Sequence, residues 1–384
     1  MKKVRIGIIG AGWWATSAHI PAVKSHPDAE LVAVQSREKS KAEKIARDFG
    51  AKYACTSLRE ILAVKELDAV IVASTPNVHF TQARAALERG LHVLIEKPMT
   101  FTADEARELV ESAAQKKLQL LISCPWHFTA HGIAARRLIL SGALGKIKMI
   151  SVLMTNPIDK LLRGINTTPT HGMENVYVEP RHGSYNDPAI AGGGQIYCQV
   201  SHAAAYLTFL TGLRAAEVFA RFDRDGSRND IYNTLTVTLE NGALVNLAST
   251  GATPLGERNY EVRVFGSKAI LQLELWRGTM TLTDFAGQRT EFKPLAENEI
   301  YPGQSPALNF VDAILGKKPN GSPGELGLAA MEIIEAACES ARTNRCEKIR
   351  EVKNPTQARR KRSKQTLRAG SKFECKPEVN RLKS

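Results

Sequence analysis

The sequence is short of several features that would assign it to a specialised class of protein. None of its apolar runs reaches the roughly 20 residues that a membrane-spanning helix needs. Its six cysteines are scattered over 384 residues without a C-x-x-C pair or a metal-ligand spacing, a pattern typical of reduced thiols. The N-terminus carries two lysines but lacks the apolar stretch and cleavage site of a secretory signal. We therefore expect a cytoplasmic protein with no membrane partner and no metal.

Acidic residues are the scarcer charged type, and the imbalance is concentrated near the C-terminus. The formal net charge is +13, of which residues 354–384 supply +8 through ten Lys or Arg and two Glu. This segment predicts a disordered, solubilising tail. The basic run at 359–364 leaves nucleic-acid binding as an alternative. However, the segment 354–384 has a single aromatic residue, Phe373, on which a base could stack. We expect no nucleic-acid partner.

A short apolar segment at the start of the chain runs directly into a glycine-rich turn. Residues 4–9 are followed by Gly10-Ala11-Gly12-Trp13-Trp14-Ala15, which fits G-x-G-x-x-A. In such a turn the first glycine permits the tight bend, and the second lets the backbone approach a pyrophosphate. The following helix then offers free N–H groups to the anion. The motif predicts dinucleotide binding at Gly10, Gly12, Trp13 and Trp14.

Strands and helices alternate through the first third of the chain, which predicts a doubly wound parallel sheet. The predicted strands cover residues 4–9, 31–35, 69–73, 91–95 and 119–123. Ligands of such sheets bind beyond the carboxyl ends of the strands. The residues that follow these strands are therefore candidates for cofactor binding: Ser36, Arg37, Thr75, Pro76, Asn77, His79, Glu96 and Lys97.

The pattern changes after about residue 125. A helix is predicted at 130–141, a strand at 146–155, a loop-rich segment at 156–191 and, after Gly192-Gly193-Gly194, a helix at 195–211. Six alternating stretches between residues 216 and 283 then predict an antiparallel sheet, and two helices close the pattern at 306–315 and 324–344.

Several of these motifs together resemble those of the Gfo/Idh/MocA oxidoreductases, a family named for glucose–fructose oxidoreductase and inositol dehydrogenase. The matching pieces are the glycine turn, Thr75-Pro76-Asn77-Val78-His79, Glu96-Lys97-Pro98, the triple glycine with His202, and the closing helices. The resemblance implies an α/β protein with a Rossmann domain (1–124), an α/β domain with an open, mainly antiparallel sheet (125–353) and the basic tail (354–384). It also implies hydride transfer between a nicotinamide cofactor and a sugar, polyol or sugar derivative.

The resemblance further implies that Lys97 and His202 are the catalytic acid/base groups. In the family pattern an aspartate precedes the histidine by four residues, on the same side of a helix, but this chain has Cys198 there. A cysteine is a poor general acid. Either Lys97 and His202 act alone, or another group substitutes. Gln199, one helical turn from His202, is a candidate for orienting that histidine or the substrate.

The identity of the cofactor depends on the end of the second strand. An acidic residue there would bind the ribose 2′-hydroxyl of NAD, whereas Ser36 and Arg37 suit a 2′-phosphate. We therefore expect NADP over NAD, although an arginine also stacks on adenine in NAD enzymes. Five residues are candidates for contacts with the substrate: Trp126, His127, His171, Tyr185 and Gln199.

Two alternatives to a dehydrogenase remain open. The missing aspartate is compatible with a redox-neutral sugar enzyme that holds NAD tightly, oxidises its substrate transiently and then eliminates or epimerises. The other alternative is a regulator that senses a sugar or cofactor, although the presence of Lys97 and His202 argues against it. The exposed face of a large open sheet often becomes a subunit contact, so we also expect a homo-oligomer.

Overall fold

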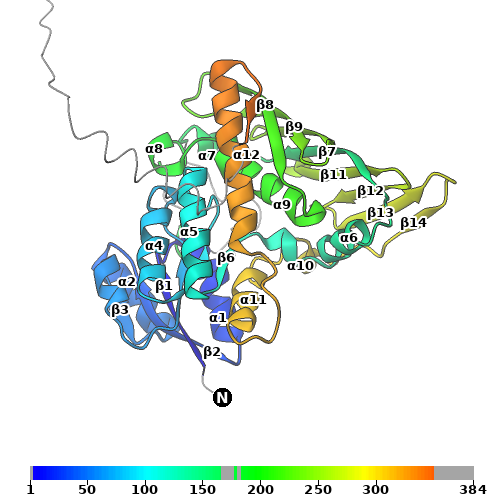
Figure 1. The fold of residues 1–384 in the computed structure, drawn as a ribbon. Helices are drawn as coiled ribbons and strands as arrows, with labels where there is room; N and C mark the ends of the chain where they lie inside the picture. The colour runs from blue at the N-terminus through cyan, green and yellow to red at the C-terminus, as the bar shows by residue number, and fades with distance from the viewer. Residues whose placement is uncertain (1–2, 166–176, 180–182, 350–384) are drawn as a thin grey trace, which may run out of the picture. The chain divides into compact units, whose positions relative to one another are not determined.

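The structure is a computed structural model that describes residues 3–165, 177–179 and 183–349, and two β-sheets organise this part of the chain (Figure 1). No helix within these residues is both long and apolar enough to cross a membrane. His171, one of the predicted substrate contacts, lies outside the described residues. The same is true of the basic tail.

The first sheet has six parallel strands in the order β3-β2-β1-β4-β5-β6, which confirms the predicted doubly wound arrangement. Its strands are β1 (Val4–Ile9), β2 (Ala29–Gln35), β3 (Tyr53–Cys55), β4 (Ala69–Val72), β5 (His92–Ile95) and β6 (Leu120–Ile122). The connecting helices are η1 (Ala15–His19), α1 (Ile20–Ser25), α2 (Lys39–Phe49), α3 (Leu58–Leu62), η2 (Pro76–Val78), α4 (His79–Glu88) and α5 (Ala103–Lys116). Strands β4 and β5 are buried almost throughout because helices cover both faces of the sheet.

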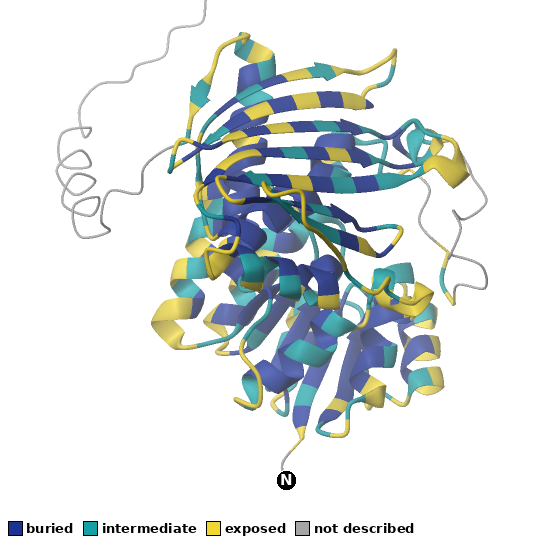
Figure 2. Ribbon diagram, turned by 90° about the vertical axis from the view of Figure 1, so that its right-hand side faces the viewer, coloured by how far each residue is buried: buried dark blue, intermediate teal, exposed yellow. Residues whose placement is uncertain are grey.

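The second sheet has nine strands in the order β14-β13-β12-β11-β7-β10-β9-β8-β15, and all neighbours are antiparallel except β7 and β10. Its strands are β7 (Ile147–Thr155), β8 (Ala215–Asp223), β9 (Tyr232–Leu239), β10 (Leu244–Thr250), β11 (Asn259–Gly266), β12 (Ala269–Glu274), β13 (Thr279–Asp284), β14 (Arg289–Glu291) and β15 (Glu347–Lys348). Buried and exposed residues alternate along its central strands (Figure 2). The predicted open, mainly antiparallel sheet is thus confirmed.

Helices cover one face of this second sheet. The helices after β6 are η3 (Pro125–Phe128), α6 (Ala130–Leu140), α7 (Asp159–Leu162), α8 (Pro188–Ala191), η4 (Ile196–Val200), α9 (Ser201–Thr211), η5 (Leu255–Glu257), α10 (Glu297–Ile300), α11 (Ser305–Ile314) and α12 (Gly324–Thr343). Helix α9 is buried along its whole length, between α6 and α12.

The last two long helices return to the first sheet. Helix α11 places Phe310 in the same hydrophobic core as strand β1, and α12 packs on α5 and β6 as well as on α9 and β8. The buried carboxylate of Glu332 on α12 pairs with Arg107 of α5 and with Arg214, which precedes β8. Local periodicity predicts these helices but not where they dock. The boundary at residues 124 and 125 stays a prediction.

Two predicted helices begin differently from the expectation. The helix expected after the glycine turn and the helix expected at 195–211 each begin with a π-helical turn, η1 and η4, before the α-helix starts. A π turn holds one more residue than an α turn, so it rotates the residues that follow relative to those before. Both turns contribute directly to the candidate site.

Candidate active site

The glycine turn has the geometry that a dinucleotide phosphate needs. Gly10 has φ of +81°, and a Cβ there would lie 2.5 Å from Cα of Ser74, so no other residue fits. A Cβ on Gly12 would meet only the Gly10 carbonyl, at 3.9 Å, so the space beside Gly12 is open to a ligand. Gln35, the last residue of β2, holds the turn by accepting the Gly10 N–H at 3.0 Å. The residues present therefore fit the pyrophosphate of a nicotinamide dinucleotide.

Glu96 follows β5 and is held by donors from the first helical turn. One carboxylate oxygen, Oε1, lies 2.8 Å from the indole Nε1 of Trp14 and 2.8 Å from Nε2 of His19, and the other accepts the Lys97 N–H at 3.2 Å. Burial pushes the pKa of Glu96 upward, but the hydrogen bond and charge of His19, together with Ser123 and the charge of Lys97, outweigh it and leave the pKa below its ordinary value. Glu96 is therefore a carboxylate at neutral pH.

Lys97 is joined to the second sheet's helices through its ammonium group. Its Nζ donates to the backbone carbonyl of Cys198, in η4, at 2.9 Å. The Lys97–Pro98 peptide bond is cis. The carbonyl of Pro98 faces Nδ1 of His79 at 2.8 Å, and the carbonyl of Ser74 faces Nε2 at 3.1 Å. His79 thus joins the ends of β4 and β5 from a fully buried position.

His202 lies in the first turn of α9, with its ring packed edge-on against Trp126 at 5.1 Å between centroids. Burial, together with the charge of Lys97, holds the pKa of His202 well below its usual range. The imidazole is therefore neutral at physiological pH. Within the described ranges, its Nδ1 has no hydrogen-bond partner. His202 thus lies close enough to Lys97 for the charge of the ammonium to act on the imidazole.

Residue 198 acts differently from the expectation for a helix. The expected arrangement places the side chains at 198 and 202 on one side of a continuous helix, but Cys198 lies within the π turn and reaches Lys97 through its carbonyl oxygen. Burial raises the pKa of its thiol, so the group stays protonated at neutral pH. The amide of Gln199 lies 3.8 Å from the Cys198 sulfur. A neutral thiol does not replace an aspartate as a base.

The triple glycine makes room for the packing of Tyr197 and Asp230 against the start of the helix. A Cβ on Gly192 or Gly193 would lie within 3 Å of the Tyr197 ring, and one on Gly194 would lie 2.1 Å from the Asp230 carbonyl. Asp230 also accepts the N–H groups of Gly194 and Ile196, at 2.9 and 2.8 Å. This contact fixes the start of the π turn.

Aromatic side chains lie beside Glu96, and the sequence analysis did not identify one of them. Tyr301 packs on Trp126 at 4.8 Å and on Trp14 at 6.1 Å. Burial raises its pKa, and Glu96 and Cys198 act on it electrostatically. Tyr301 belongs to a polar stretch without periodicity, so no local signal identifies it. Tyr185, a predicted substrate contact, is likewise close to Cys198 and Glu96 and is hydrogen-bonded to Trp13. It therefore lies beside the same group of residues as Tyr301.

His127 is placed in the core instead of the cluster. Its Nδ1 contacts the Ser322 hydroxyl at 2.8 Å, and its ring stacks on Phe209 at 4.4 Å between centroids. Burial lowers the pKa of His127 to about 3. Trp126, its neighbour, is also buried but contacts His202 directly.

The other predicted cofactor residues lie at the expected edge of the first sheet. Ser36 bonds through its N–H to Cys55 on β3, and Arg37 is exposed. Thr75 donates its hydroxyl to the Asn77 amide at 2.7 Å, in the short helix that Pro76 begins.

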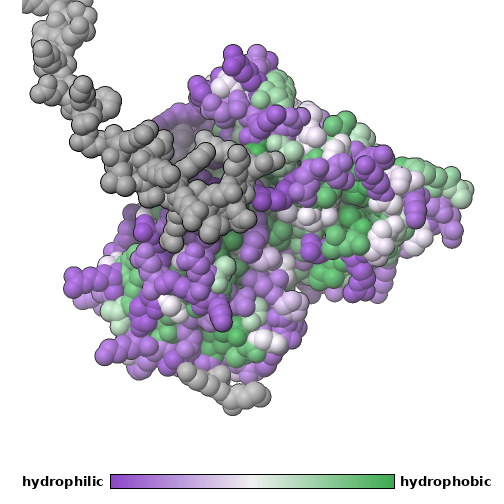
Figure 3. Space-filling model, viewed as in Figure 1, coloured by the Kyte–Doolittle hydropathy of each residue, from purple (hydrophilic) through white to green (hydrophobic). Residues whose placement is uncertain are grey.

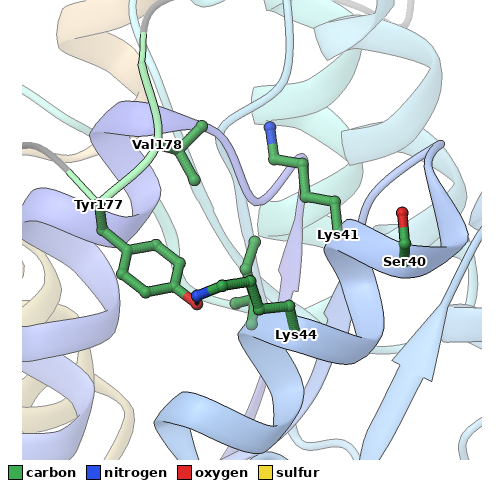
Figure 4. A pocket seen from close by; sticks show the side chains of 6 residues that line it. Ser40, Lys41, Lys44, Tyr177 and Val178 are labelled. Carbon is green, nitrogen blue, oxygen red and sulfur yellow. Dashed lines mark hydrogen bonds between the residues drawn. The ribbon is translucent and has the colours of Figure 1, made fainter.

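A hollow of about 350 Å³ lies along α2, just after these residues (Figure 4). It is lined by Ser40, Lys41, Lys44, Ile45, Tyr177 and Val178. Lys44 reaches the Tyr177 hydroxyl at 2.7 Å and Asp48 at 2.6 Å. The hollow therefore lies on the helix that follows the predicted adenosine end of the cofactor site.

The fold and the site together define a dinucleotide-binding oxidoreductase. Residues 4–123 match the model of an oxidoreductase family with an NAD-binding Rossmann fold, and residues 133–272 match the GFO/IDH/MocA C-terminal domain. The chain belongs to the Gfo/Idh/MocA family of oxidoreductases.

Individual relatives extend over most of the chain. An uncharacterized oxidoreductase of Synechocystis is 28% identical over 74% of both chains, and 1,5-anhydro-D-fructose reductase of Ensifer adhaerens is 26% identical over 90% of this chain and 98% of its own. Among solved structures, GenD2 from gentamicin A biosynthesis, in complex with NAD, covers 91% of this chain and 97% of its own with a TM-score of 0.74 at 21% identity. That likeness concerns the fold.

Proposed function

We propose that the protein transfers hydride between NAD(P) and a sugar, polyol or sugar derivative, with Lys97 and His202 as its acid/base groups. The observation that carries the proposal is the convergence of Lys97, His202 and Glu96 at the carboxyl end of β5. The name of the Ensifer relative, an anhydrofructose reductase, supports a carbohydrate as the substrate class.

The chemistry divides between the cofactor and the side chains. When bound, the nicotinamide supplies or accepts the hydride. In the direction of reduction, Lys97 donates a proton from Nζ to the carbonyl oxygen that becomes the hydroxyl; in the direction of oxidation it takes that proton back. Only one of the two groups takes that proton: where Lys97 stays an ammonium, the neutral imidazole of His202 accepts it instead. The aromatic side chains exclude water from the reacting atoms.

The experiment is a screen of the purified protein with a panel of aldoses, ketoses, polyols and sugar acids. We expect the absorbance of the reduced nicotinamide to change with at least one of them, and the change to disappear in the Lys97→Met variant. A panel that leaves the absorbance unchanged but yields an epimer or an elimination product in NMR spectra supports the redox-neutral alternative. Sugar binding without any chemical change supports the regulator.

We further propose that the cofactor is NADP. Ser36 and the exposed Arg37 stand where an acidic residue would repel a 2′-phosphate, and Lys41 lies in the first turn of α2, four residues after Arg37. Replacing Ser36 with Asp should lower the affinity for NADP by about one to two orders of magnitude and leave NAD less affected. Thr290→Asp, on the exposed strand β14, is the matched control. A parent protein that already prefers NAD would contradict the proposal.

The open face of the second sheet is, we propose, a contact with a second copy of this chain. Leu244 is 54% exposed and Met149 41% exposed, and these residues are directly opposite each other on β10 and β7. A further exposed apolar pair, Ile133 and Leu140, lies on α6, and Figure 3 shows apolar and polar side chains interspersed on the face that carries this helix. The sheet offers the larger regular surface.

Light scattering tests this contact. We expect a mass of at least two chains, which Leu244→Glu should reduce to one. Leu255→Glu, an equally exposed leucine in η5, is the control and should leave the mass unchanged. A parent protein that is monomeric would overturn the proposal.

A further inference from the structure

The turn η1 presents two donors to a single oxygen atom. Trp14 lies immediately before the turn and His19 is its last residue, and both contact Oε1 of Glu96 at 2.8 Å. His19 is completely buried, and no partner for its Nδ1 exists in the part of the chain that the structure describes. Because Glu96 is a carboxylate, the proton of His19 belongs on Nε2.

The other oxygen of Glu96 extends this network to Lys97. Oε2 accepts the backbone N–H of Lys97 at 3.2 Å, while the Lys97 ammonium donates to the Cys198 carbonyl at 2.9 Å. Lys97 is therefore held at both ends, and the hold at its backbone depends on the orientation of the Glu96 carboxylate. We propose that His19 is a positioning residue for Lys97, because it fixes the carboxylate that fixes the lysine backbone. The inference rests on the catalytic role proposed for Lys97.

His19 and Trp14 contribute unequally to this hold. The Trp14 ring is half-buried and is also restrained by Tyr301, whereas the His19 ring lies wholly in the interior. If Trp14 loses its N–H, the imidazole remains on Oε1. If His19 loses its ring, a cavity opens beside a buried carboxylate. Removal of His19 should therefore disturb Lys97 more than removal of Trp14 does.

The kinetic test compares His19→Leu, His19→Gln and Trp14→Phe in the full-length protein, with the substrate found in the panel. Because a misplaced catalytic group costs up to about a hundredfold, kcat of His19→Leu should fall by about 10- to 100-fold, with KM and the cofactor Kd within about threefold. Gln keeps a donor near the position of Nε2, so His19→Gln should recover most of the loss. Trp14→Phe should lose less than His19→Leu. Equal losses in the Gln and Leu variants, or a loss confined to KM, would overturn the proposal.

The pH dependence supplies a second readout that a purely structural role would not move. The hydrogen bond from His19 lowers the pKa of Glu96, so its removal raises that pKa, and the acid limb of kcat/KM should move to higher pH. The other titratable or polar groups that act on Glu96 are Lys97, Ser123, His79, Cys124, Tyr185 and Tyr301. All of them are present in both proteins that are compared.

Tryptophan fluorescence follows the same titration without substrate or cofactor, because Trp14 donates directly to Glu96. The Glu96→Gln variant identifies which part of the signal belongs to this carboxyl group. We expect the midpoint of that part to lie at higher pH in His19→Leu than in the parent. An unchanged midpoint overturns the role of His19, whatever the outcome of the sugar screen. A failed screen with a shifted midpoint overturns the proposed function alone.

Discussion

The two π turns, η1 and η4, hold two neighbouring residues at the end of β5 by different means. η1 delivers a buried side chain, His19, to Glu96, and η4 delivers a main-chain carbonyl, that of Cys198, to Lys97. A contact made by a side chain is lost when the residue changes, whereas a contact made by a carbonyl survives any substitution that preserves the turn. The comparison explains how the chain carries a cysteine at position 198 and still holds its lysine.

The largest effect should come from removing the side chain of Lys97. Lys97→Met loses both the ammonium and its contact with the Cys198 carbonyl, so turnover should fall by about two to four orders of magnitude, with cofactor affinity nearly intact. Steady-state kinetics and cofactor titration measure the two quantities separately. Lys116→Met, at the exposed end of α5, is the control and should behave like the parent. A Lys97→Met enzyme within a few-fold of the parent would refute the assignment.

The next largest effects are expected at the two glycines that precede η1, where one substitution should affect folding and the other cofactor binding. Gly10→Ala must accept φ of +81° and a contact of 2.5 Å with the Ser74 backbone, so the free energy of unfolding should fall by about 3 kcal/mol or more. Gly12→Ala faces open space and should unfold like the parent, but its methyl group occupies the ligand's side. We expect its cofactor Kd to rise by about 10- to 100-fold. Urea unfolding and cofactor titration of both variants would show whether the two glycines differ in this way.

The anchor of the second turn should be a smaller but still clear stabilising element. Asp230→Asn replaces two acceptor oxygens with one, so a buried N–H of Gly194 or Ile196 loses its partner, and we expect a loss of about 1–3 kcal/mol in the free energy of unfolding. Asp284→Asn is the matched control, because that side chain accepts both of its backbone N–H groups through one oxygen in a surface turn. Equal losses in the two variants would show that Asp230 does not anchor η4.

His127, which lies in neither π turn, should make the stability of the protein depend on pH. Burial lowers the pKa of His127 from 6.5 to about 3, so below pH 6.5 the unfolded chain binds a proton that the folded chain refuses. The contribution of His127 to stability is therefore fully present above pH 6.5 and is lost as pH falls toward 3. Between pH 6.5 and 5 the loss should be about 1–2 kcal/mol. His127→Gln should flatten the pH dependence of urea unfolding by that amount; an unchanged slope would contradict the assignment.

The smallest effect is expected at Cys198 itself. Cys198→Ala keeps the main-chain carbonyl that accepts from Lys97, so turnover should fall by less than about tenfold, far less than for Lys97→Met. The same kinetic assay measures it. A loss as large as that of Lys97→Met would show that the thiol, and not the carbonyl, is the essential group.

The strands and the glycine turn could be predicted because their signals are local. Residues 4–15 carry both the buried strand and its turn, and Glu96 and Lys97 stand directly after an apolar run. The contacts that complete the site join distant residues: His19 and Glu96 are 77 positions apart, and Lys97 and Cys198 are 101 apart. A π turn also rotates the helix that follows, and no periodicity in this sequence marks that extra residue. For these reasons His19 and Tyr301 were missed, and the side chain of Cys198 was expected where its carbonyl lies.

The position of helix α12 against the first sheet has a consequence for folding during translation. Strand β6 meets the entrance of α12 through the N–H of Ile122 and the carbonyl of Ser322, and Gly324 and Gly327 lie against Leu120 and Met99. Domains generally fold from the N-terminus as the ribosome releases them. We therefore expect the first sheet to leave the ribosome with the flank at β6 uncovered, until α12 has also been translated. The first sheet, although its strands are synthesised first, therefore completes its packing only after α12 has formed.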